Sequence, residues 1–180
     1  KEGSNDPSES VEIRQANNIG ERCESLLSSM INVEGLAEFV EEKEEEGLER
    51  EEITFELTTA IVDGKVGNFE SDEQKVNAAT RTAVALLTEG VVAAPLEGID
   101  EITIEQNDDG TDFIRIGYNG PIRSAGGTGQ ALSVLVADYI RQQLDIGGFK
   151  PRDKEIKRYA EEISLYDQEK GMQYRPKDKE

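Results

Sequence analysis

The amino-acid sequence predicts an α+β fold, a mostly helical domain with one β-hairpin and a glycine-rich loop leading into a buried helix. Three observations support this prediction. Apolar residues recur at helical spacing over most of the chain. Two short stretches near the middle alternate apolar and polar residues instead, which is typical of half-buried strands. Four glycines lie within ten residues between the second of these stretches and the next helical pattern.

Four helices are expected in the first half of the chain. Asn18 is the expected capping residue of the first, and Asn32 is the expected start of the second. The third should end at Gly64, and Ser71 with Gln74 forms the capping box of the fourth. The residues expected to face inward are Ile19, Cys23, Leu26, Leu27 and Met30, then Val33, Leu36, Ala37 and Val40, then Ile53, Leu57, Ala60 and Ile61, and finally Val76, Thr80, Ala83, Val84 and Leu87.

A run of acidic residues from Glu41 to Glu52 interrupts these patterns. It is either a solvated helix face or a flexible connection, and it does not suit a metal ion, because carboxylate ligands must converge on one point. We therefore divide the chain into an N-terminal helical segment with an acidic connection, residues 1–50, and an α+β core, residues 51–180. The chain as a whole is interpreted as a fragment of a longer protein.

The hairpin is predicted from residues 102–104 and 114–118, where isoleucines and Tyr118 alternate with polar side chains. The segment between them, Asn107 to Gly110, has the composition of a turn. Asp108 and Asp109 in this turn, together with Asp112, are interpreted as solvated turn residues rather than as a metal cluster. A short apolar run from Val91 to Ala94 precedes the hairpin as a strand or a buried connection.

The glycine-rich loop runs from Gly120 to Gly129 and precedes a helix whose apolar face is Leu132, Leu135, Val136, Tyr139, Ile140 and Leu144. It matches neither common nucleotide-binding motif, because no lysine follows Gly129 and Leu132 stands where a third glycine would be needed. Two readings remain open. The glycines allow close packing or a positive φ, or the loop and the helix N-terminus hold an anion with the help of Arg123.

Composition excludes several functions. The 180 residues include 39 acidic and 20 basic ones, a net charge of −19, which disfavours nucleic-acid binding by the whole surface. With no histidine and a single cysteine, Cys23, the chain contains no Ser-His-Asp triad, no cysteine-based zinc site and no internal disulfide. No apolar run is long enough to span a membrane. We expect Cys23 to be a small core residue.

Basic residues gather only in the last third of the chain. Residues 1–90 carry 8 Lys and Arg against 22 Asp and Glu, whereas residues 119–180 carry 11 against 10. Five basic residues lie within nine positions, at and before a helix expected to start at Pro151 or Asp153. They form a phosphate-facing patch, or they are a helix surface balanced by neighbouring glutamates. The inward face of this helix is expected to comprise Ile156, Tyr159, Ala160 and Ile163.

The segment GPIRSAGGTGQALSVLVADYIR, residues 120–141, resembles a signature of the archaeal family D DNA polymerase large subunit, also called DNA polymerase II. Three more segments are similar to that family in the same order: residues 6–27, residues 81–99 and residues 149–180. They begin DPSESVEIRQ, RTAVALLTEG and FKPRDKEIKR. Together they cover most of the chain, and they place it at the N-terminal region of the large subunit.

The resemblance implies the catalytic subunit of a replicative DNA polymerase. It implies magnesium held by carboxylates beyond this segment, a small subunit with 3′–5′ exonuclease activity, primed DNA and a sliding clamp as partners, and a cytoplasmic location. No catalytic residue and no metal ligand is assigned within the chain. The segment itself is expected to serve assembly and DNA contact, the alternative being a structural or docking domain without nucleic-acid contact. The candidate nucleic-acid-binding residues are Arg123, Ser124, Gly126, Gly127, Thr128, Lys150, Arg152, Lys154, Lys157 and Arg158.

Overall fold

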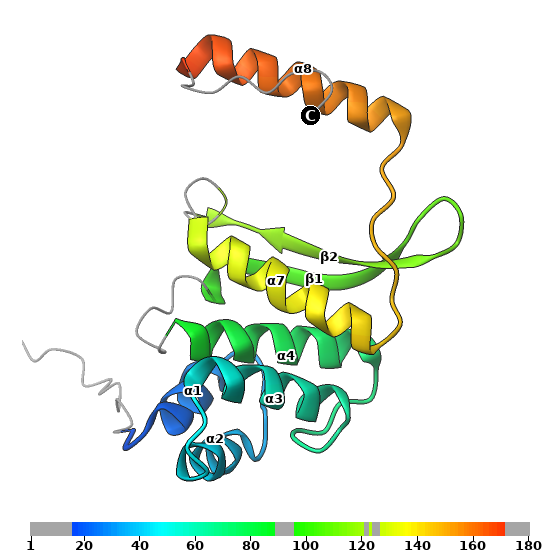
Figure 1. The fold of residues 1–180 in the computed structure, drawn as a ribbon. Coiled ribbons are helices and arrows are strands. Elements are labelled where there is room, and N and C mark those ends of the chain that lie inside the picture. Colours follow the sequence, from blue (N-terminus) through cyan, green and yellow to red (C-terminus); the bar gives the residue numbers. More distant parts are fainter. Residues whose placement is uncertain (1–15, 89–95, 121–122, 124–126, 172–180) are drawn as a thin grey trace, which may run out of the picture.

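A computed structural model describes residues 16–88, 96–120, 123 and 127–171 of the chain (Figure 1). Over these residues the protein is mostly helical with one two-stranded antiparallel sheet, which confirms the predicted α+β class. The elements are α1 (Ile19–Leu27), α2 (Leu36–Glu45), α3 (Arg50–Val62), α4 (Asp72–Leu87), β1 (Ile99–Gln106), β2 (Asp112–Tyr118), α7 (Gly127–Gln143) and α8 (Asp153–Lys170).

Side-chain caps begin two of these helices as predicted. The Asn18 side chain accepts a hydrogen bond from the Glu21 N–H at 2.8 Å, and Ser71 accepts one from the Gln74 N–H at 3.2 Å. The second hydrogen bond of the predicted capping box is shifted by one residue. The Gln74 side chain accepts a hydrogen bond from the Glu70 N–H and not from the Ser71 N–H. Both caps satisfy N–H groups that have no partner within the helix.

Two predictions near the N-terminus are wrong. Helix α2 begins at Leu36 after Gly35, whose φ of 83° only glycine adopts readily, and not at Asn32. Val33 is buried, but it lies before the helix. Met30 lies beyond the end of α1 and is 39% exposed, so it does not belong to the inward face of that helix. The acidic run is helical in α2 as far as Glu45, leaves the helix over residues 46–49, and ends in the first turn of α3.

Helix α4 is the centre of the core. It contacts α1, α3, α7 and β1, and it lies in the middle of the stack of elements in Figure 1. Ten of the eleven positions from Val76 to Leu86 are buried, and four of them are alanines that let the neighbouring helices approach closely. A helix surrounded on all sides has no polar stripe, so the five inward positions predicted for it are only part of its buried surface.

The hairpin pairs β1 with β2 antiparallel as predicted, and its register places Ile102 opposite Ile116 and Ile104 opposite Ile114. These isoleucines share the face that packs on the core. The hydroxyl groups of Tyr118 and Ser133 lie 2.6 Å apart and join the end of β2 to α7. The hairpin therefore carries the start of α7 at one end and its own turn at the other.

Helix α7 buries a narrower face than predicted. Gly129, Ser133, Val136, Ala137 and Ile140 are buried, whereas Leu135, expected to face inward, is 54% exposed. The helix lies on α4 and β2, so small residues occupy the contact and larger ones next to it remain in solvent.

Helix α8 stands apart from the other elements in Figure 1, connected by a linker of residues 144–152. Its start at Asp153 is as predicted. The expected inward face is wrong, because Ile156 is 54% exposed and Tyr159 is 71% exposed. Ala160 and Ile163 are only partly buried. Periodicity identified the apolar side of this helix correctly. The prediction that this side packs against the core is wrong, because the other described residues leave it exposed.

None of the helices in the described part of the chain is long and apolar enough to cross a membrane. The predicted strand or connection at Val91–Ala94 lies outside the described residues, and so do two of the candidate loop residues, Ser124 and Gly126.

Candidate functional site

The described residues of the glycine-rich loop are exposed except Gly129, which is buried in α7. Arg123 and Thr128 are exposed, and the Arg123 N–H donates to the Asn119 carbonyl at 3.4 Å. Gly127, the first residue of α7, has a φ of 40°, and a Cβ built on it meets nothing within 4 Å. Of the two explanations for its glycine, the structure therefore favours the positive φ over close packing.

The second candidate group lies beside the hairpin turn, where Asn107 anchors the linker. Its side-chain amide donates to the Gly148 carbonyl at 3.0 Å and accepts from the Lys150 N–H at 2.8 Å. Phe113 of β2 packs against Phe149, with ring centroids 5.1 Å apart. These contacts fix the linker against the hairpin and determine where α8 begins.

The acidic turn residues bind the basic residues of the linker. Arg152 donates two hydrogen bonds of 2.6 Å to the Asp108 carboxylate, and the Lys150 ammonium lies 2.5 Å from the Asp109 carboxylate. The hydrogen bond from Arg152 lowers the pKa of Asp108, and those from Lys150 and then Thr111 lower the pKa of Asp109. Sequence reasoning treated this turn as merely solvated, because its partners lie more than 40 residues away.

The remaining basic residues lie on α8. Arg158 donates to Glu162 one turn further along the helix, at 2.8 Å. Lys154 and Lys157 are exposed and form no ion pair within the described part of the chain. Of the five basic residues predicted to form one patch, only these two are therefore available to an external anion.

The loop and the basic linker do not form one site. Arg123 follows the end of β2, whereas Lys150 lies at the hairpin turn where β2 starts. The seven residues of β2 place these two ends roughly 20 Å apart. The described candidate residues therefore form two separate groups, and in the second the hairpin neutralises Lys150 and Arg152.

Sequence reasoning missed Arg81, which lies on α4 and is 8% exposed. All five of its N–H groups are used. Nε donates to the Asn77 side chain at 2.7 Å, Nη1 to the Leu96 carbonyl at 3.1 Å and the Met30 sulfur at 3.8 Å, and Nη2 to the carbonyls of Ile99 and Asp100, both at 3.0 Å. Burial lowers the pKa of Arg81, and the nearby Asp100 charge opposes that effect.

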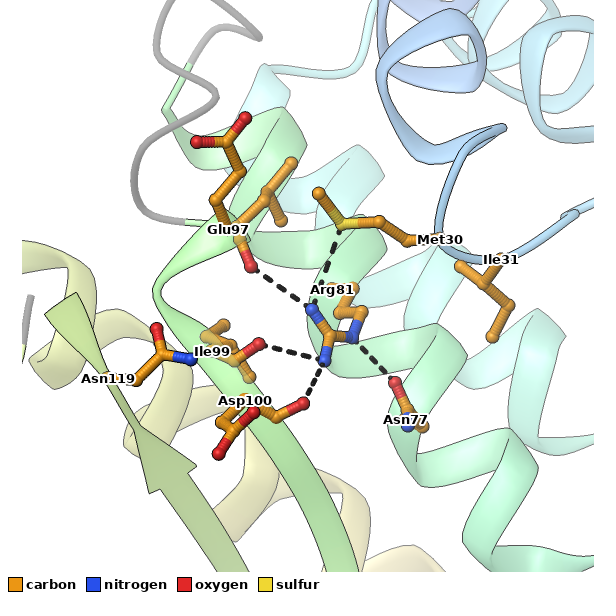
Figure 2. Close-up of a pocket in the computed structure, with 9 residues that line it drawn as sticks. Met30, Ile31, Asn77, Arg81, Glu97, Ile99, Asp100 and Asn119 are labelled. Carbon is orange, nitrogen blue, oxygen red and sulfur yellow. Dashed lines mark hydrogen bonds between the residues drawn. The ribbon is translucent and has the colours of Figure 1, made fainter.

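This guanidinium lines a surface pocket of about 440 Å³, and Figure 2 shows it among the other lining residues with its hydrogen bonds. Glu97 and Asp100 add carboxylates to its lining, and Asn77 and Asn119 add amides. Because every donor of Arg81 already has a protein acceptor, the pocket offers no free cation to a phosphate. Arg81 instead fixes the backbone entering β1 against α4, which is a structural role.

The carboxylates do not suit a magnesium ion. Within the described residues no group of three or more Asp, Glu or Cys side chains converges at metal-binding distance. Asp108 and Asp109, the pair that most resembles a ligand set in the sequence, are engaged by Arg152 and Lys150. No step of a metal-assisted reaction is therefore assigned to this part of the chain.

The structure is that of an acidic, mostly helical domain in which 11 of the 20 basic residues lie in residues 119–180. A family profile described as DNA polymerase II large subunit DP2, N-terminal, matches residues 1–180. Proteins named DNA polymerase II large subunit are 54% identical in Halobacterium salinarum and 56% identical in Haloarcula marismortui, each over the whole chain. The relative in Archaeoglobus fulgidus is 50% identical over 97% of the chain.

The chain belongs to the DNA polymerase II large subunit family and corresponds to its N-terminal region. This confirms the resemblance found in the sequence. The chain covers 13% of the Halobacterium relative, 12% of the Haloarcula relative and 14% of the Archaeoglobus relative. Most of each relative's length therefore lies outside the region that matches.

Proposed function

We propose that the intact protein containing this chain is the catalytic large subunit of an archaeal replicative DNA polymerase. It extends a primer on a template, with magnesium held by carboxylates that lie beyond these 180 residues, and it acts in the cytoplasm. The observation that carries this proposal is the match of the family's N-terminal profile to the entire chain, with relatives above 50% identity that bear the same name.

Within that enzyme, this N-terminal region supports assembly and does not perform the chemistry. The assignment rests on the lack of a converging carboxylate set in the described residues and on the absence of histidine. The test is primer extension by the full heterodimer and by the 180-residue chain alone. We expect the heterodimer to extend the primer and the isolated chain not to extend it. Extension or nuclease activity that remains with the purified chain contradicts the assignment.

We also propose that Lys154, Lys157 and Arg123 contact the phosphates of primed DNA in the assembled enzyme. The supporting observation is that the two lysines are exposed and have no ion-pair partner in the described structure, in a region with 11 basic and 10 acidic residues. Contacts with phosphate release counterions, so each lost contact lowers the slope of log affinity against log salt by roughly 0.9 on duplex DNA.

The experiment measures the affinity of the full heterodimer for primed DNA over a series of salt concentrations. We expect Lys154→Gln with Lys157→Gln to lower the slope by about 1.8, because two phosphate contacts are removed. Arg123→Gln is measured separately because it lies in the other group. The matched control is Lys65→Gln, which removes an exposed lysine that pairs with Asp63 in the acidic half. An unchanged slope in both test variants contradicts DNA contact.

The alternative is a docking role without nucleic acid, with the exonuclease small subunit or the sliding clamp as partner. The net charge of −19 and the neutralised linker favour it. The same variants separate the two proposals. Loss of small-subunit co-purification with an unchanged salt slope would assign Lys154 and Lys157 to an assembly interface.

A further inference from the structure

Exposed large apolar side chains are concentrated in one stretch of the sequence. Among the described residues, all but one of them lie between positions 134 and 166, the exception being Met30. The members of this set are Val134, Leu135, Phe149, Ile156, Tyr159, Leu165 and Tyr166, each at least 54% exposed. Where exposed apolar side chains gather on one face of an element, they commonly mark an interface.

On α8 these residues form a stripe, which we define as Ile156, Tyr159, Ile163 and Tyr166. At 100° per residue they fall within roughly 80° of the helix circumference. Ile156, Tyr159 and Tyr166 are 54%, 71% and 56% exposed, and Ile163 is partly buried. Most of the stability of a helix in a protein comes from packing its apolar face rather than from the helix alone.

The base of α8 is held firmly, so the stripe has a defined position. Asn107 fixes Gly148 and Lys150, Phe149 packs on Phe113, and Arg152 forms two hydrogen bonds with Asp108 immediately before the helix starts. A helix whose base is anchored while the other described residues leave its apolar side uncovered is preorganised to receive a partner, because little ordering entropy remains to be lost on docking.

We propose that the α8 stripe packs against the part of the large subunit that follows the N-terminal region in this family. The matched region is the N-terminal one and is 13% or less of two relatives, so in those proteins a long polypeptide continues after α8. A covalently linked partner is present at a high effective concentration, which favours it over a separate chain. An apolar helix face also suits permanent packing better than it suits a phosphate backbone.

This proposal rests on family membership and not on the proposed DNA contact, so failure of either leaves the other intact. The two also involve different sides of α8. Lys154 and Lys157 lie roughly 100–160° around the helix from Ile156. Two other partners could pack on the stripe, namely the small subunit and a second copy of this chain. The experiment distinguishes both of them from the proposed partner.

The test places a photo-crosslinking residue, p-benzoylphenylalanine, at Tyr159 in the full-length large subunit, both alone and with the small subunit. The matched control places it at Leu165, which is 60% exposed and lies roughly 120° around the same helix from Tyr159. We expect position 159 to crosslink within one polypeptide, to residues after 180, at least fivefold more than position 165 does. Crosslinks from 159 that go to the small subunit or to a second copy, or that do not exceed those from 165, overturn the proposal.

A second measurement does not depend on the crosslinker. Amide hydrogen exchange in α8 is compared between the full-length large subunit, its Ile156→Ser and Tyr159→Ser double variant, and Leu165→Ser. We expect slow exchange in the parent, exchange at least tenfold faster in the double variant, and little change in the control. Exchange in the parent as fast as in an unstructured peptide, or equal rates in all three proteins, contradicts a covered stripe.

Discussion

Replacing Arg81 by methionine is expected to destabilise the fold substantially without touching any proposed binding residue. Methionine keeps most of the aliphatic volume but removes all five donors. The carbonyls of Leu96 and Ile99, residues that are 1% and 3% exposed, then lose their partners. The Asp100 carbonyl lies in a more exposed residue, where water replaces the lost donor.

The magnitude follows from these two buried carbonyls. Each unsatisfied buried acceptor costs about 1–3 kcal/mol, and avoiding the burial of a guanidinium charge offsets part of this cost. The expected loss is therefore about 2–4 kcal/mol, which lowers the melting temperature of a chain of this size by roughly 5–15 °C.

The assay is thermal and urea unfolding of Arg81→Met beside a matched control, Arg115→Met. Arg115 lies on the exposed side of the hairpin and pairs with Glu101 and Glu105. Because exposed ion pairs contribute little, the control should melt within about 1 °C of the parent. If Arg81→Met melts as the control does, the carbonyl contacts do not stabilise the fold and the structural role of Arg81 is wrong.

Three further expectations concern single positions. Gly127→Val should lower stability by about 1 kcal/mol in thermal unfolding, because its φ of 40° is unfavourable for valine, and an unchanged melting temperature would show that the loop adapts freely. Burial raises the pKa of Cys23 to about 12, so a thiol reagent at pH 8 should label it only after unfolding, and rapid labelling of the native chain contradicts this. In the folded protein the carboxyls of Asp108 and Asp109 have pKa values below the reference value of 3.8. Their contacts should therefore stabilise the linker fully above pH 3.8, and this stabilisation should be lost as the pH falls through the pKa values of the folded state. Hydrogen exchange of residues 147–150 should accelerate over that range, and Asp108→Asn with Asp109→Asn should abolish this pH dependence.

Local patterns predicted the features that are determined locally. Asn18 and Ser71 were recognised as helix caps because a cap depends on residues two or three positions away. The hairpin was recognised because strand pairing across a short turn keeps Ile102 opposite Ile116. The family resemblance was also carried by contiguous segments, so it did not require any knowledge of the fold.

Features that depend on distant residues were missed or assigned wrongly. Arg81 reaches carbonyls 15 to 19 positions away, and nothing in a helical pattern identifies those partners. Asp108 was interpreted as solvated because its partner, Arg152, lies 44 positions later. The face of α8 was assigned to the core because periodicity reveals which side of a helix is apolar and not what covers it.

These distant contacts also change what the charge of the C-terminal third means. Its near-zero balance suggested a basic patch, yet Lys150 and Arg152 neutralise the hairpin turn and thereby position α8. What remains on α8 is two separate surfaces, with Lys154 and Lys157 on one side and the α8 stripe on the other. One helix therefore has room for a phosphate backbone on its basic side while its apolar side packs against protein. For this reason the salt-series variants and the α8 stripe variants should act independently, and their effects should add when they are combined.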